Sequence, residues 1–154
     1  KVQRWLSRMG PFEFRHIYPR DELHPPKRPP FQQVWFRLAE RVGDAPELHR
    51  TLLAYASDFY LLGTATFPHG ISYYQPSVQM ASLDHALWFH RPFRVDEWLL
   101  YSIDSPSAQG SRGLARGLIY DRNGRLVAST AQEGLIRVME DVDVDPSAAP
   151  KTSQ

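Results

Sequence analysis

The order of hydrophobic and polar positions predicts one strand, one long helix and then four further strands. The strands are expected at Phe31 to Leu38, Val78 to Phe89, Trp98 to Ile103, Leu114 to Tyr120 and Arg125 to Val138. Asn123-Gly124, between the last two strands, is a strong signal for a hairpin turn. Because the later connections are short, they favour antiparallel pairing, with the single helix packed on one face of the sheet. The pattern therefore predicts an α+β fold.

The helix is expected to begin at Asp44-Ala45-Pro46-Glu47. Asp44 stands at the N-cap, Pro46 in the first turn and Glu47 at the capping-box position. Apolar residues then recur at steps of four and three and form a stripe about 15 residues long: Leu48, Leu52, Tyr55, Phe59 and Leu62. Gly63 and Pro68 are expected to end the helix.

The two ends of the chain differ from the middle. Residues 1–30 contain Pro19, Pro25, Pro26, Pro29 and Pro30, which favour an irregular arm. Residues 140–154 are acidic and then rich in Pro, Ala and Ser, which predicts a disordered tail. Residues 31–139 are therefore expected to form the folded domain. A first residue other than Met is expected of a processed chain or of a piece of a longer one.

Composition excludes several classes of function. The net charge of +1 over 154 residues argues against a dedicated nucleic-acid binder. Without cysteine, the chain has no disulfides, thiolate zinc sites or cysteine nucleophile. No apolar run approaches the roughly 20 residues that span a membrane, so no membrane association is expected. The terminal Thr-Ser-Gln is not a peroxisomal signal of the Ser-Lys-Leu type.

Two polar residues lie where apolar ones are expected. Asp58 falls on the flank of the helical stripe, where a carboxylate is partly desolvated. It is either a flank residue that reaches solvent or an arginine, or a base that handles water. Alternation in the last strand points Gln132 inward, toward the helix. It is either a structural amide bonded to backbone or part of a site.

The stretch from Ala81 to Phe93 combines a hydroxyl, a carboxylate and two imidazoles with apolar residues. In one continuous strand, Ser82 and Asp84 share a face while His85 lies on the other, so Asp84 and His85 cannot readily pair. His85 and His90 also fall on opposite faces, and no zinc spacing is present, so no metal site is predicted. Asp84 and His85 are interpreted as structural residues.

Arginines could bind anionic groups of a ligand. Arg91, Arg112 and Arg116 are the candidates for substrate binding. Exposed arginines are common, so each is weak evidence by itself.

The chain closely resembles the acyl-CoA thioesterase II family, the bacterial and peroxisomal long-chain acyl-CoA hydrolases with a double hotdog fold. The matching segments, which lie between residues 10 and 138, are Gly10-Pro11-Phe12-Glu13-Phe14-Arg15, Leu53-Ala54-Tyr55-Ala56-Ser57-Asp58, Pro68-His69-Gly70, Ser82 to Phe93, Glu97-Trp98-Leu99-Leu100-Tyr101, Ser111-Arg112-Gly113 and Ala128-Ser129-Thr130-Ala131-Gln132-Glu133-Gly134. Family members carry two hotdog units, and this chain resembles the second unit with the linker that precedes it.

The resemblance implies a hotdog fold, in which an antiparallel sheet wraps one long helix, and residues 1–30 as mostly inter-unit linker. It also implies a catalytic set of Asp58, Ser82 and Gln132 that uses acyl-CoA as substrate and needs no cofactor. Asp58 would take a proton from water while Ser82 and Gln132 hold that water, and backbone N–H groups near the helix would polarise the thioester carbonyl. The bacterial pattern has Thr where this chain has Ser82, whose rotamer is less fixed.

Alternatives to a self-sufficient thioesterase stay open. The chain could be a half that is inactive until it pairs with a second hotdog unit, either a separate N-terminal piece or another copy in a homo-oligomer. A hotdog dehydratase acting on acyl thioesters is a third reading, although the Asp, Ser and Gln set fits water attack better. Relatives in the family are cytosolic or peroxisomal, so the expected compartment is one of these two.

Overall fold

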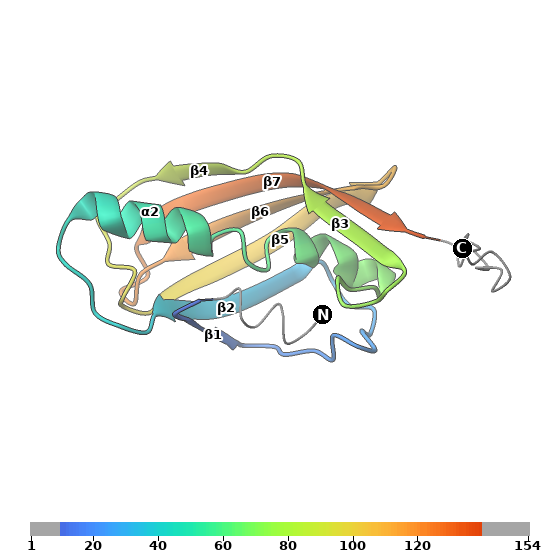
Figure 1. The fold of residues 1–154 in the computed structure, drawn as a ribbon, viewed down its shortest axis with the longest axis horizontal. Coiled ribbons are helices and arrows are strands. Elements are labelled where there is room, and N and C mark those ends of the chain that lie inside the picture. Colours follow the sequence, from blue (N-terminus) through green and yellow to red (C-terminus); the bar gives the residue numbers. More distant parts are fainter. Residues whose placement is uncertain (1–9, 140–154) are drawn as a thin grey trace, which may run out of the picture.

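The computed structural model describes residues 10–139, which form one seven-stranded sheet curled around two helices (Figure 1). The elements are β1 (Phe12–His16), β2 (Phe31–Leu38), α2 (Pro46–Ala56), the 3-10 helix η1 (Leu62–His69), β3 (Val78–Ser82), β4 (Ala86–Phe89), β5 (Leu99–Gln109), β6 (Arg112–Tyr120) and β7 (Leu126–Val138). The strand order is β1-β2-β5-β6-β7-β3, and β4 also pairs with β7. Every pairing is antiparallel, which confirms the predicted α+β arrangement.

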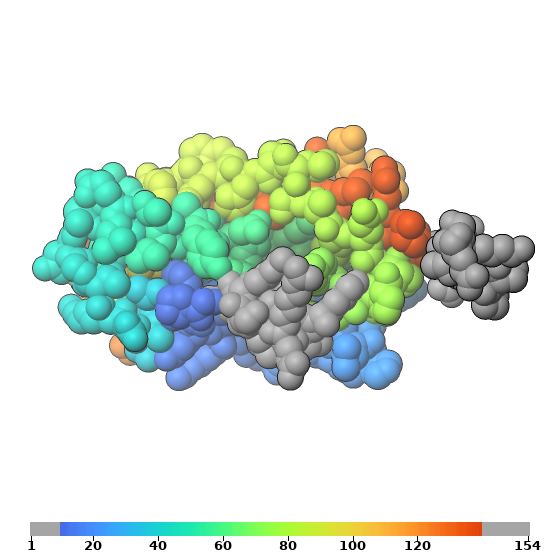
Figure 2. All heavy atoms as spheres, in the orientation of Figure 1, coloured from blue at the N-terminus to red at the C-terminus, as the bar shows by residue number. Residues whose placement is uncertain are grey.

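The last two strands form the predicted hairpin. Gly124 has a φ of 76°, and the Asp121 carboxylate accepts hydrogen bonds from the backbone N–H groups of Asn123 and Arg125. Gly124 of the Asn-Gly pair supplies the positive φ of the turn. From the side drawn in Figure 2, α2 and the chain around β3 cover much of the sheet.

The segment expected to be an irregular arm contributes a strand. β1 pairs with β2 over five residues, from Phe12 with Leu38 to His16 with Val34. The prolines that argued against regular structure all follow this segment, apart from Pro11 directly before it, so the backbone N–H groups of β1 are free to bond. The expected tail at 140–154 and residues 1–9 of the arm lie outside the described residues, and the domain boundary at residue 30 stays a prediction.

The helix is shorter than predicted and starts differently. α2 begins at Pro46 after an N-cap residue, Ala45, that makes no side-chain capping bond. The predicted cap, Asp44, pairs instead with Arg94 at 2.5 Å. α2 ends at Ala56, and the chain then turns through Tyr60, which has a φ of 66°, before η1 begins. A left-handed residue cannot continue an α-helix, so the helical stripe is divided between two helices.

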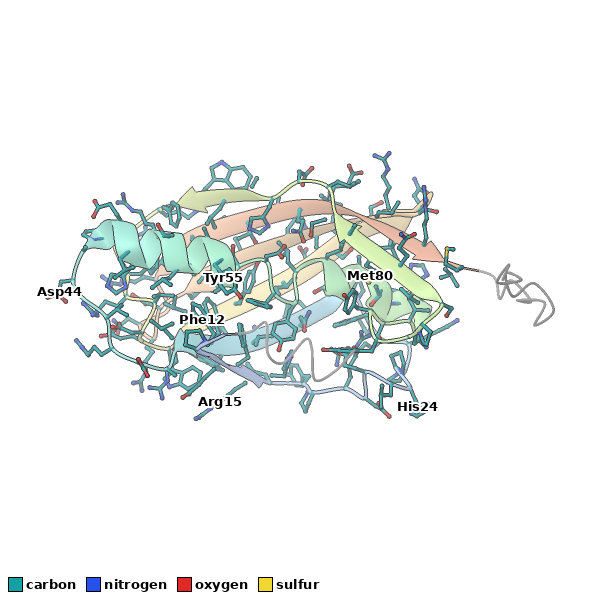
Figure 3. All side chains as sticks on the ribbon, viewed as in Figure 1. Phe12, Arg15, His24, Asp44, Tyr55 and Met80 are labelled. Carbon is teal, nitrogen blue, oxygen red and sulfur yellow. The ribbon has the colours of Figure 1, made fainter. Side chains whose placement is uncertain are left out.

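The buried face of α2 is rotated from the predicted stripe. His49, Leu53 and Ala56 are its buried residues, whereas Leu48 is 39% and Tyr55 50% exposed. Figure 3 shows Tyr55 above Phe12 of β1, and their ring centroids are 6.1 Å apart. Both sets of positions follow helical spacing, so the spacing could not choose between them.

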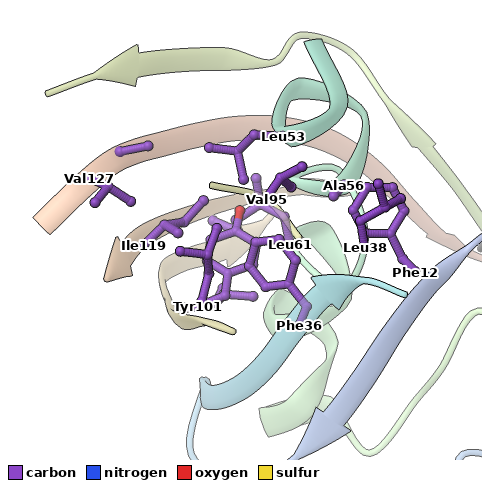
Figure 4. Close-up of a cluster of buried hydrophobic side chains, with 14 residues drawn as sticks. Phe12, Phe36, Leu38, Leu53, Ala56, Leu61, Val95, Tyr101, Ile119 and Val127 are labelled. Carbon is purple, nitrogen blue, oxygen red and sulfur yellow. The ribbon is translucent and has the colours of Figure 1, made fainter. Parts of the chain in front are cut away.

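The hydrophobic core lies between α2 and the concave face of the sheet (Figure 4). Leu53 and Leu61 pack there against Phe36 of β2, Tyr101 of β5 and Ile119 of β6, and all five are almost fully buried. Three strands thereby hold the end of α2 and the turn that follows it. That turn carries Asp58.

Candidate active site

The structure brings the three predicted site residues together although up to 74 positions separate them in the chain. Gln132 Nε2, from β7, donates a hydrogen bond of 2.6 Å to Asp58 Oδ1, in the turn after α2. Ser82 Oγ, from the last residue of β3, donates to the same Asp58 oxygen at 3.5 Å. Two donors on Oδ1 fix the orientation of the carboxylate. Among the described residues, no hydrogen bond occupies Asp58 Oδ2.

The turn that holds Asp58 is anchored from the sheet. The hydroxyl of Tyr101 donates a hydrogen bond of 2.9 Å to the Ser57 carbonyl, one residue before Asp58. Burial raises the pKa of Tyr101, so its hydroxyl stays protonated and able to donate. On the other side, Gln32 Nε2 donates a hydrogen bond of 3.0 Å to the carbonyl of Tyr60, the residue with the left-handed backbone conformation. Strands β5 and β2 thus fix both ends of the turn.

Gln132 points inward as predicted and is 1% exposed. Its amide nitrogen donates to Asp58 and also to His85 Nδ1, at 3.2 Å. Placing the amide oxygen there instead would oppose it to the carboxylate, so the hydrogen-bond partners determine which way the amide faces. Gln132 Oε1 is buried and has no hydrogen-bond partner within residues 10–139. The amide is therefore a donor to two site residues rather than a group bonded to the backbone.

His85 is a site residue that sequence reasoning missed. Its Nε2 lies 2.8 Å from Ser57 Oγ, and that hydroxyl donates its single hydrogen to the Ala54 carbonyl at 2.9 Å. Nε2 must therefore carry the proton and donate to Ser57, which leaves Nδ1 as the acceptor for Gln132. A continuous chain of hydrogen bonds runs from the end of α2 through His85 and Gln132 to Asp58.

The prediction that Ser82 and His85 lie on opposite faces of one strand is wrong, because the predicted strand is interrupted. Ser82 pairs with Gly134 and Ala86 with Ala131. Four residue steps from Ser82 to Ala86 therefore lie opposite three residue steps on β7. The extra residue is a β-bulge, which re-aims the side chains beside it. The carboxylate of Asp84 closes the gap by accepting the Glu133 N–H at 2.7 Å. The alternation of side chains between the two faces of a strand therefore does not hold across residues 83–85.

Asp58 is also less buried than expected. It follows the end of α2 by two residues, and it is exposed rather than partly desolvated on a helix flank. The helix ends early, so Asp58 points from the turn into an open cavity. Asp58 thus lies on the wall of the cavity and is open to solvent.

The cavity beside Asp58 has a volume of about 350 Å³ and includes Ser82 and Gln132 in its wall. Leu62, Phe67 and Met80 give it an apolar lining, and Tyr60 and Tyr74 add aromatic rings. Burial raises the pKa of Tyr74 to about 12 and also raises that of Tyr60, so both phenols stay neutral. Arg20 and Arg28 line the same cavity.

The three arginines predicted to bind substrate do not line this cavity. Arg91 bonds to the Leu126 carbonyl, Arg112 approaches Glu133 at 3.5 Å, and Arg116 pairs with Asp104. Their role in substrate binding stays a prediction. Within residues 10–139 no cluster of three or more potential metal ligands occurs, and no helix there is long and apolar enough to cross a membrane.

Comparison with solved structures identifies the class of fold. The chain aligns with an acyl-CoA thioesterase II, TesB2, from Mycobacterium marinum with a TM-score of 0.73 and 47% identity, over 86% of this chain and 51% of that one. A hot dog fold protein from Alicyclobacillus acidocaldarius, at 17% identity and a TM-score of 0.61, has the same fold. The architecture is a hotdog fold.

Sequence comparison identifies the family. Residues 12–135 match the family described as "Acyl-CoA thioesterase". Acyl-CoA thioesterase 2 of Haemophilus influenzae is 42% identical over 84% of this chain and 46% of its own length. Human acyl-coenzyme A thioesterase 8 is 41% identical over 92% of this chain and 44% of its own. The chain belongs to the acyl-CoA thioesterase family, and it spans about half the length of these relatives.

Proposed function

We propose that this chain hydrolyses acyl-CoA thioesters by direct attack of water, with Asp58 as the general base. The observation that carries the proposal is the pair of donors, Gln132 Nε2 and Ser82 Oγ, on one oxygen of Asp58 at the wall of an apolar cavity. They leave Oδ2 to accept a proton. Family membership supports the class of reaction.

In the proposed reaction, water bound at Asp58 Oδ2 attacks the thioester carbonyl carbon while its proton passes to the carboxylate. The tetrahedral intermediate then collapses, the carbon–sulfur bond breaks, and the CoA sulfur leaves with the proton that Asp58 took from water, which returns Asp58 to a carboxylate. The products are a free fatty acid and CoA. No covalent acyl-enzyme is needed, which agrees with a chain that has no cysteine.

Ser82 and Gln132 act as positioning groups for the base and the water. Gln132 is held from behind by His85 and is almost fully buried, so its amide does not rotate freely. Ser82 contacts Asp58 more loosely, at 3.5 Å, and its hydroxyl can turn toward a bound water. Fixed donors around a reacting water lower the reorganisation that the reaction requires.

A second candidate function is that of a half that needs a partner hotdog unit. The exposed carboxylate of Asp58 supports this reading, because a base works best where water is restricted. Strand β4 ends the sheet on one side, and exposed apolar residues lie on and next to it: Leu83, Trp88 and Phe89. Uncovered strands with apolar side chains favour pairing with another sheet. The relatives' double length agrees with a second unit.

Thiol release from a long-chain acyl-CoA tests the proposed chemistry. Loss of a general base should lower kcat by roughly 10²–10⁴-fold in Asp58→Asn. Asp84→Asn is the matched control, because it makes the same change at a carboxylate that bonds to the Glu133 backbone instead. Equal activity in wild type and Asp58→Asn would show that Asp58 is not the base.

The same assay separates the two candidate functions. The chain is assayed alone and after addition of the first hotdog unit of a relative. Release by the pair but not by the chain alone supports a site completed by the partner, whereas equal release supports a self-sufficient unit. Conversion of a 3-hydroxyacyl-CoA without thiol release would favour a dehydratase. We further propose a cytosolic or peroxisomal compartment, and import of a tagged chain into peroxisomes would decide between them.

A further inference from the structure

Two arginines from the segment between β1 and β2 stand on the wall of the cavity that contains Asp58. The guanidinium carbons of Arg20 and Arg28 each lie 4.0 Å from the centre of the Phe67 ring. The two groups therefore cannot be further apart than twice that distance. Contact with an aromatic ring favours each cation, but it does not satisfy the N–H groups that lie in the guanidinium plane.

Both arginines keep unused donors. The Arg20 side chain is 4% exposed, and its Nε and Nη2 each bond to Glu22 at 2.8 Å. Its Nη1 is buried and has no partner among residues 10–139. Arg28 Nη1 donates to the Tyr18 carbonyl, while Arg28 Nε is buried and also without a partner in the described part of the chain. Buried donors without acceptors are rare in folded proteins because each costs free energy.

The charges near these donors do not balance. Glu22 is the carboxylate that pairs with Arg20, and Arg28 makes no ion pair within residues 10–139. Burial lowers the pKa of Arg28, and the neighbouring Arg20 lowers it further. The two cations thus have one carboxylate partner, Glu22, because Asp58, the other carboxylate on this cavity wall, bonds to Gln132 and Ser82 instead. An additional anion would be stabilised there.

We propose that Arg20 and Arg28 form a subsite for an anionic oxygen group of the substrate, a phosphate or a carboxylate. The inference rests on the proposed thioesterase function, since it places the reacting thioester and the anion in one cavity. Guanidinium groups suit such ligands because their planar donors match two oxygens at once.

The same chemistry has two possible sources in a thioester substrate. A thioester has two arms, and the apolar lining from Leu62, Phe67 and Met80 could hold either of them. If the CoA arm enters, its phosphates are the anion. If the acyl arm enters, the anion is a carboxylate at the far end of the acyl chain. Both sources require the same two arginines.

Binding of four small probes, measured by calorimetry, tests the subsite without requiring turnover. CoA is compared with pantetheine, which lacks its phosphates, and octanoate with 1-octanol. Arg28→Gln removes the less engaged cation and leaves a neutral polar side chain in its place. Arg122→Gln, at an exposed position of the β6–β7 hairpin, removes the same charge elsewhere. We expect Arg28→Gln to weaken binding of a charged probe about tenfold, while neutral probes and Arg122→Gln are unaffected.

The outcomes identify the source. If Arg28→Gln weakens the binding of CoA alone, the subsite takes a CoA phosphate. If it weakens the binding of octanoate alone, the subsite takes a carboxylate of the acyl chain. If it weakens the binding of both, the subsite accepts anions in general. If Arg28→Gln binds all four probes as Arg122→Gln does, the proposal is overturned. If Arg28→Gln does not fold, the wild-type chain is titrated while the Arg28 Nε–H resonance is recorded. A shift caused by charged probes alone supports the subsite, and no shift refutes it.

Asp58→Asn separates this proposal from the proposed function. It should lower thiol release by roughly 10²–10⁴-fold yet bind the charged probes at least as tightly as the wild type does, because it removes a negative charge and no donor to the anion. A chain that binds anions through Arg28 but releases no thiol, either alone or with the first hotdog unit of a relative, would retain the subsite and lose the thioesterase assignment.

Discussion

His85 Nδ1 accepts a hydrogen bond of 3.2 Å from Gln132 Nε2, the same nitrogen that holds Asp58. This acceptor exists only while Nδ1 is unprotonated. Apart from Asp58 itself, no other partner among the described residues orients the Gln132 amide, since its Oε1 has no partner within 10–139. The geometry of the proposed base therefore depends on a histidine that does not touch it.

We predict that His85→Ala lowers kcat for thiol release about tenfold with little change in KM. Without the acceptor, the Gln132 amide can rotate away from Asp58, and small displacements of catalytic groups are costly. His85→Asn, which keeps an acceptor, should retain part of the activity. His90→Asn, which changes a histidine bonded to Ser129, is the control. A uniform loss of kcat and a raised KM would indicate a general structural role.

Removing the hydroxyl of Tyr101 should destabilise the turn before Asp58. Tyr101→Phe leaves the Ser57 carbonyl without its buried donor, which should cost about 1–2 kcal/mol in the free energy of unfolding. Urea denaturation measures this loss. Tyr120→Phe, at the half-buried end of β6, should cost much less. Equal effects in the two variants would mean that the Tyr101 hydroxyl does not anchor the turn.

Gly134 leaves the room that η1 occupies against β7. A Cβ at Gly134 would lie 2.6 Å from Leu62 Cδ1 and 2.9 Å from its Cγ, and both distances are shorter than packing permits. Gly134→Ala should therefore destabilise the fold by about 1–3 kcal/mol. Gly43→Ala, where a Cβ meets nothing within 4 Å, should be nearly neutral. Thermal melts of the two variants decide, and a stable Gly134→Ala would show that η1 can move away from the sheet.

Stability in acid should depend on Asp96. Its side chain is 1% exposed and accepts hydrogen bonds from both Arg94 and the Val42 N–H. The bonds from Arg94 lower the pKa of Asp96 from the usual 3.8 to about 2. A lowered folded-state pKa stabilises the protein above pH about 4, and this contribution is lost as the pH falls to about 2.

Asp96→Asn should thus be less stable than wild type at neutral pH, and the difference should shrink between pH about 4 and about 2. Urea denaturation at several pH values measures the free energies of unfolding. Glu97→Gln, the exposed neighbour, provides the control. A difference that stays constant down to pH about 2 would exclude an Asp96 contribution of this kind.

Local pattern was sufficient for some parts of the molecule. The hairpin at Asn123-Gly124 was predictable because its φ requirement is met by residues within the turn. The inward direction of Gln132 was predictable because β7 is regular from Ala128 to Leu135, so alternation holds around Gln132. The meeting of Asp58, Ser82 and Gln132 came from the family resemblance, because no local rule joins residues on three different elements.

The misses share a different cause. His49 is polar, so the hydrophobic pattern passed over it, yet it is buried and accepts the Val95 N–H on Nδ1. Asp44 is a good capping residue, but Arg94 competes for its carboxylate. His85 was interpreted as structural because the alternation argument required an unbroken strand from Val78 to Phe89. In each case a partner distant in the chain decides the outcome, and that partner is invisible to local sequence patterns.

The bulge between β3 and β4 makes the number of residues in the site as important as their identity. With one residue fewer between Ser82 and Ala86, both chains would have the same number of residues here and could pair as a regular ladder. The same deletion would turn His85 away from Gln132. Local regularity and site geometry thus favour different chain lengths at this point. A substitution in residues 83–85 changes one side chain, whereas an insertion or a deletion there changes which side chains face Asp58.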